Sequence, residues 1–162
     1  EISRWVSDGG RLILMESAVS SFAGKEGFDL KAKAGDTSST KDLKYGNRER
    51  DAISDQIPGA IYKVGLDSSH PLAYGYDSDT YVMIKNVIAY DYLKDGWNVG
   101  KLQERVSGFA GAKTNSKMKD VPVFAVQDSG KGKIVYLNES PIFRAFWYGG
   151  KQLMANAAFM VR

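Results

Sequence analysis

Very few residues of this sequence have side chains that could act as a nucleophile, a base or a transition-metal ligand. The 162 residues contain no cysteine and one histidine, His70. The lack of cysteine excludes a thiolate nucleophile, a thiolate metal site and a disulfide framework. A catalytic zinc site needs about three protein ligands, and one histidine followed by Pro71 cannot supply them. We therefore expect no metal and no other cofactor in this chain.

The stretch HPLAYGY around His70 has two interpretations. We favour a structural one, in which the imidazole hydrogen-bonds backbone and fixes the loop. In the alternative, His70 and Tyr74 bind a ligand. Trp97 and the tyrosines of the segment 74–92 would then line a cleft for a carbohydrate or a peptide, although most such rings in a sheet are half-buried with their hydroxyl groups in water. These tyrosines are Tyr74, Tyr76, Tyr81, Tyr90 and Tyr92.

Arg144 lies within the aromatic segment PIFRAFWY. A guanidinium among aromatic rings stacks on a ring face or pairs with a buried carboxylate. It could also bind a substrate carboxylate through two parallel hydrogen bonds. We favour the structural role and keep ligand binding by Arg144 as the alternative.

The charge pattern indicates no nucleic-acid partner. Lys and Arg number 22 against 19 Asp and Glu, and the signs are interleaved, as in KAKAGDTSSTKDLKYGNRERD. Such interleaving is typical of a solvated surface rather than of a basic face. No apolar run approaches the roughly 18 residues that a membrane span needs. With 43% hydrophobic residues the chain is globular, and we expect one domain covering residues 1–162.

The pattern of apolar residues predicts an α/β fold. The segment RWVSDGG is typical of a helix end closed by glycine, and residues 12–15 are typical of a strand covered on both faces. Residues 23–56 look like a surface excursion. We expect strands around 60–66, two short strands within 80–93 and a short strand in GWNVGKL. PVFAVQDSGKGKIVYLNESP predicts a hairpin, and an apolar stripe predicts a helix over 151–161.

Three segments together resemble the second half of a class I glutamine amidotransferase-like domain. They are WVSDGGRLILMES, HPLAYGY and SGKGKIVYLNESPIFRAFWYGGKQLMANAAF. The resemblance is to the version appended C-terminally to Bacteroidetes-type zinc carboxypeptidases. It implies a flavodoxin-like three-layer α/β/α sandwich with an added β meander and hairpin. It also implies that the first strands and helices precede Glu1, so that the chain is an incomplete part of the sandwich.

The resemblance also implies where catalytic residues would stand. An active member carries a cysteine on a sharp strand-to-helix elbow and a histidine after a later strand, and the thiolate attacks the glutamine amide. Here Ser17 occupies the elbow, while Asn138 and Glu139 occupy the place of the histidine. A hydroxyl without a base is a poor nucleophile, and the surroundings of Ser17 are not G-x-S-x-G. We expect Ser17 to be a small residue that permits a tight turn.

The functional expectation is a non-catalytic accessory domain of a secreted or periplasmic zinc carboxypeptidase. Its partner would be the rest of the parent polypeptide, and the zinc would lie in the parent's catalytic domain. Two alternatives stay open: a module that binds peptide or glycan through aromatic residues, and a serine hydrolase that uses Ser17. The layout implied by the resemblance brings Glu16 and Glu139 to the same end of the sheet as Arg144. We expect Arg144 to pair with one of them, preferentially Glu16.

Overall fold

The computed structural model describes residues 1–34 and 44–162. Its helices and strands follow one another along the chain as α1 (Ile2–Ser7), β1 (Arg11–Met15), α2 (Ser17–Phe22), η2 (Tyr45–Asn47), α3 (Arg48–Ser54), β2 (Gly59–Leu66), η3 (Pro71–Ala73), β3 (Asp79–Ile84), β4 (Trp97–Phe109), α4 (Ala112–Lys117), β5 (Pro122–Ser129), β6 (Gly132–Leu137), η4 (Phe143–Ala145), η5 (Tyr148–Gly150) and α5 (Lys151–Phe159).

The six strands form one mixed sheet in the order β1-β6-β5-β4-β2-β3. β1 pairs with β6 in parallel, and every other neighbouring pair is antiparallel. The predicted strand at 12–15 is therefore paired on one side, as expected. It is less buried than its apolar sequence suggested, with Leu14 as its buried residue, because β1 lies at an edge of the sheet.

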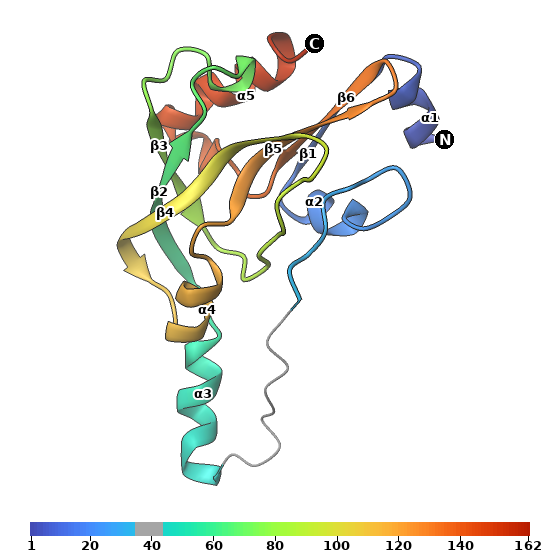
Figure 1. Ribbon diagram of the computed structural model, residues 1–162. Coiled ribbons are helices and arrows are strands. Elements are labelled where there is room, and N and C mark those ends of the chain that lie inside the picture. Colours follow the sequence, from blue (N-terminus) through green and yellow to red (C-terminus); the bar gives the residue numbers. More distant parts are fainter. Residues whose placement is uncertain (35–43) are drawn as a thin grey trace.

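Side chains of β6 alternate between two hydrophobic cores, one on each face of the sheet. Ile134 and Tyr136 pack with Val6 of α1 and Val19 of α2. Val135 and Leu137, on the other face, join a core that contains α5 and η3 residues. Strand residues point alternately to opposite faces, so a continuous apolar run such as KIVYL serves both cores. Figure 1 shows α5 and the α1–α2 pair on opposite sides of the sheet, and the predicted α/β class is confirmed.

The hairpin and the terminal helix are also confirmed. β5 and β6 pair antiparallel from Phe124↔Leu137 to Ser129↔Gly132. α5 packs on the sheet through Leu153 and Ala157, which are buried in the larger core.

Three sequence-based predictions were wrong in extent. The segment GWNVGKL belongs to a 13-residue strand, β4, because β2 pairs along it through register shifts. Residues 80–93 contain only β3, and beyond it Tyr90 forms an isolated bridge with Ala32. The excursion 23–56 is not confined to the surface, since Phe28 and Leu30 are buried against β6 and α2; its residues 35–43 lie outside the described part.

Candidate functional site at the carboxyl ends of β1 and β6

The parallel strands β1 and β6 end at the same edge of the sheet. Met15 pairs with Leu137, so Glu16 and Ser17 follow one strand where Asn138 and Glu139 follow the other. In α/β sheets, ligands commonly bind outside the carboxyl ends of the strands. The positions that the sequence singled out at the elbow and at the base therefore do meet in space.

Glu16 has a strained backbone at this edge. Its φ is 49° and its ψ is −120°, outside the regions that non-glycine residues normally adopt. Its N–H donates to the Leu137 carbonyl at 3.0 Å, and its own carbonyl accepts from Val19 N–H at 3.0 Å. Strand β1 thus turns into helix α2 at a single residue. Strain of this kind often accompanies a functional site.

Lys85, just after β3, contacts both carboxyl groups at the edge. Its ammonium lies 3.4 Å from Glu16 Oε1. Its backbone N–H donates to Glu139 Oε1 at 3.2 Å, and the N–H of Asn86 donates to the same oxygen at 2.8 Å. The two carboxyl groups and Lys85 form what we call the edge cluster.

Glu139 has an unusual proton affinity for a glutamate. Its side chain is buried, with 4% of the residue exposed. Burial raises the pKa of Glu139 to about 7, although the two backbone N–H groups and the Lys85 ammonium oppose the shift. A carboxyl group that titrates near neutrality can in principle give or take a proton. In this position it also changes charge within the physiological pH range.

Two buried polar atoms near this edge have no hydrogen-bond partner in the described structure. They are the hydroxyl of Tyr90 and Oδ1 of Asn138. Burial, and the charge of Glu139, raise the pKa of Tyr90 to about 12, so its hydroxyl keeps its proton. The amide nitrogen of Asn138 donates to the Pro122 carbonyl at 2.7 Å. Asn138 thus ties the end of β6 to the start of β5.

Ser17 is exposed at the first position of α2. The chain's one imidazole belongs to a different region, since His70 lines a pocket together with Trp97 and Lys133. Lys133 precedes Leu137 by four residues on β6, which is about 13 Å along a strand. His70 therefore lies toward the opposite end of β6 from Ser17 and is no base for its hydroxyl.

Arg144 is exposed and does not form the predicted pair with Glu16. Its guanidinium carbon lies 5.3 Å from the centroid of the Phe143 ring, and Lys85 Nζ lies 4.7 Å from that centroid. Within residues 1–34 and 44–162, no carboxylate lies within salt-bridge distance of Arg144, and Lys85 takes Glu16 instead. The prediction failed because Arg144 faces water and the Phe143 ring, and a hydrated guanidinium needs no buried partner.

His70 and Tyr74 flank η3 and are not part of the edge cluster. His70 Nδ1 accepts a hydrogen bond from Leu72 N–H at 3.0 Å, so the imidazole caps η3. Tyr74 is 63% exposed, and its carbonyl accepts from Asn156 of α5 at 2.7 Å. The proposed ligand-binding residues thus divide into two places, with Arg144 near the edge cluster and the other two beside η3.

Lys85 and Tyr90 were not singled out as members of a site by sequence analysis. Tyr90 was one of several tyrosines noted for a cleft, and Lys85 carried no signal. The hydrogen bonds from Lys85 and Asn86 to Glu139, and the effect of the Glu139 charge on Tyr90, connect segments about fifty positions apart. Only the order of strands in the sheet brings these segments together. No group of three or more histidine or acidic side chains in the described part of the chain could hold a metal ion.

No family model and no curated protein matches the chain. Among solved structures, the chain is similar to a ThuA-like protein from Bacteroides uniformis ATCC 8492, with 14% identity and a TM-score of 0.47. The match covers 97% of this chain and 60% of that one. The chain thus spans about three fifths of that protein, and at this TM-score the likeness assigns no function.

No described helix is long and apolar enough to cross a membrane.

Proposed function

We propose that this chain is a non-catalytic accessory domain built on an amidotransferase-like scaffold. The observation that carries the proposal is the isolation of Ser17. Its hydroxyl stands at a strained strand-to-helix turn, where a nucleophile would be expected, but the only imidazole lies toward the far end of β6. Serine attacks carbonyl groups only when a base takes its proton.

The residues at the place of the missing histidine have structural partners instead. Asn138 donates to Pro122, and Glu139 Oε1 accepts from the backbone of Lys85 and Asn86. Both side chains thereby join the end of β6 to neighbouring segments. This arrangement supports a role in holding the loops at the edge rather than in activating Ser17.

We further propose that the domain serves a secreted or periplasmic zinc carboxypeptidase. Support for this comes from the sequence resemblance alone. Zinc would then be bound by residues of the parent polypeptide. The full reading frame upstream of Glu1 tests it: a zinc carboxypeptidase domain is expected there, and an unrelated coding sequence would contradict it.

A hydrolysis assay of the purified chain tests whether the chain lacks catalytic activity. We expect no ammonia release from glutamine, and no cleavage of peptide or ester substrates, above the level of a Ser17→Ala variant. Activity that the unmutated chain shows and the Ser17→Ala variant lacks would overturn the proposal and establish the serine hydrolase alternative.

A second candidate function is ligand binding at the pocket beside His70. The observation in its favour is Trp97, whose large ring is 42% exposed on the wall of that pocket. Exposed tryptophan in a concave site is typical of recognition surfaces.

A further inference from the structure

A pocket of about 330 Å³ opens between η3, the starts of β4 and β6, and the end of the chain after α5. It is distinct from the edge cluster, with which it shares no residue. Val126 and Val161, both buried, are apolar residues of its lining. Its volume is at the small end of the range for ligand sites, about 300–1,000 Å³.

Two aromatic rings form one side of this pocket. The centroid of the His70 ring lies 5.7 Å from that of Trp97, with the ring planes 48° apart. Lys133 Nζ lies 5.2 Å from the Trp97 centroid. Trp97 is the first residue of β4 and pairs with Val126 of β5. The indole is therefore attached to interior strands of the sheet, and it is part of the pocket lining, with the Lys133 ammonium over its ring.

His70 provides a hydrogen-bond donor. Burial lowers the pKa of His70 from its ordinary value, so the ring is neutral at pH 7. Its Nδ1 accepts from Leu72 N–H. A neutral imidazole carries one proton, which must then reside on Nε2. The tautomer is set by η3, and Nε2 is the donor that the bond to Leu72 leaves for a ligand.

Asp67 provides a permanent acceptor. Its Oδ1 accepts from the hydroxyl of Ser69 at 2.5 Å and from Ser69 N–H at 3.1 Å. The Ser69 hydroxyl bond lowers the pKa of Asp67, so the carboxylate is ionised at neutral pH. Oδ2 is the oxygen that these bonds leave for a ligand.

The charged side chains of the lining are of both signs. They are Asp67, Lys133 and Arg162, and Lys133 also forms an ion pair with Asp128, which lies outside the lining. A phosphate would face the Asp67 carboxylate, and a cation would face Lys133. The lining therefore favours a ligand without net charge.

We propose that this pocket binds the ring of a neutral saccharide. Such a ring offers an apolar C–H face to Trp97 and hydroxyl groups that both accept from His70 Nε2 and donate to Asp67. A peptide that binds by adding a strand to the sheet would need an unpaired strand edge, and β4 and β6 are interior strands of the sheet. The inference gives the second candidate function its site and ligand class, and it is independent of whether Ser17 is catalytic.

The test is a titration of the isotope-labelled full chain followed by NMR. The probes are glucose, galactose, N-acetylglucosamine and their disaccharides, up to about 50 mM, a range that detects millimolar dissociation constants. Glycine tripeptide and inorganic phosphate serve as comparison ligands. We expect saturable shifts of the Trp97 indole N–H with at least one saccharide, and none with the comparison ligands.

Variants connect the shifts to the pocket. His70→Asn keeps a side-chain acceptor for Leu72 N–H but lacks the Nε2 donor, so it should weaken binding at least about tenfold with little change in melting temperature. Trp97→Ala, followed through the backbone amide signals of the other pocket residues, should abolish binding. The control is Trp5→Phe, which changes an exposed tryptophan on α1 outside the pocket and should bind like the parent chain.

The outcomes are distinct. Failure of every saccharide to shift Trp97, or saccharide binding unchanged in His70→Asn, overturns the inference. Binding of the tripeptide or phosphate at Trp97 instead would also overturn it, while leaving a ligand-binding function in place. None of these results bears on the hydrolysis assay.

Discussion

At the residue scale, Glu139 makes the stability of the fold depend on pH. Its pKa is about 7 in the folded chain against an ordinary value of 4.5. Between these two values the folded state holds a proton that the unfolded state releases. The contribution of Glu139 to the free energy of unfolding is therefore greatest below about pH 4.5, falls as the pH rises toward 7, and is fully unfavourable above it.

Glu139→Gln should remove this pH dependence. The glutamine keeps an oxygen for the N–H groups of Lys85 and Asn86 but cannot ionise. We expect the variant to be more stable than the parent at pH 8, by up to about 3 kcal/mol for a shift of this size, and nearly equal at about pH 4. Thermal melts at both pH values measure this.

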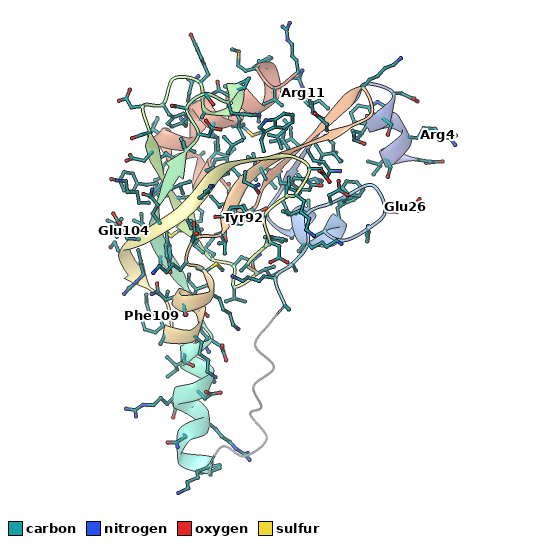
Figure 2. All side chains as sticks on the ribbon, in the orientation of Figure 1. Arg4, Arg11, Glu26, Tyr92, Glu104 and Phe109 are labelled. Carbon is teal, nitrogen blue, oxygen red and sulfur yellow. The ribbon has the colours of Figure 1, made fainter. Side chains whose placement is uncertain are left out.

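Glu104→Gln is the matched control, because Glu104 is exposed on β4 (Figure 2). It should change stability equally and slightly at both pH values. A Glu139→Gln variant that is less stable than the parent at pH 8 would show that the ionised carboxylate stabilises the edge.

For Arg144, also at the residue scale, the structure contradicts the ion pair with a carboxylate that was expected from the sequence. An exposed arginine beside a phenylalanine ring should contribute little, so Arg144→Ala should change the free energy of unfolding by less than about 0.5 kcal/mol. Arg11→Ala is the comparison, since Arg11 donates to the Ala158 carbonyl and links β1 to the end of α5 (Figure 2). It should cost about 1–3 kcal/mol. A larger loss in Arg144→Ala than in Arg11→Ala would restore the structural role first expected for Arg144.

At the element scale, sequence patterns predicted those helices and strands that are determined by their own local sequence. The β5–β6 hairpin has an apolar run on each side of an Asp-Ser-Gly-Lys-Gly turn, and α5 has an apolar stripe; both elements formed. The length of β4 was missed because it depends on pairing with β2, some forty residues earlier in the chain. The burial of Phe28 and Leu30 was missed because their neighbours come from β6 and α2.

The packing of β6 on α1 makes Gly132 a sensitive position. A Cβ there would lie 2.0 Å from the Val6 carbonyl oxygen and 2.2 Å from that of Gly10. Gly132→Ala must therefore push α1 away from the strand, and we expect a loss of about 1–3 kcal/mol, typical of overpacking. Chemical denaturation measures it. Gly46→Ala, where a Cβ would meet nothing within 4 Å, is the control, and a loss no larger in Gly132→Ala would mean that α1 does not pack as described.

At the scale of the whole molecule, the edge cluster and the pocket beside His70 lie toward opposite ends of β6. The edge cluster lies where β1 and β6 end, and the pocket beside His70 lies where β4 and β6 begin. Sequence supplied the inventory, namely one histidine and no cysteine, and the resemblance located Ser17, Asn138 and Glu139. The sequence could not show how far His70 lies from Ser17. The distance between them depends on the strand order and on how η3 packs against α5.

Ser17 is expected not to be an activated nucleophile, because the imidazole of His70 lies toward the other end of β6. Incubation of the purified chain with a fluorophosphonate, which reacts covalently with activated serines, followed by peptide mass spectrometry, tests it most directly. A serine protease treated in parallel shows that the reagent is active. The structure predicts that Ser17 stays unmodified. An adduct on Ser17 that forms in the native chain, and does not form when the chain is unfolded before the reagent is added, would contradict it.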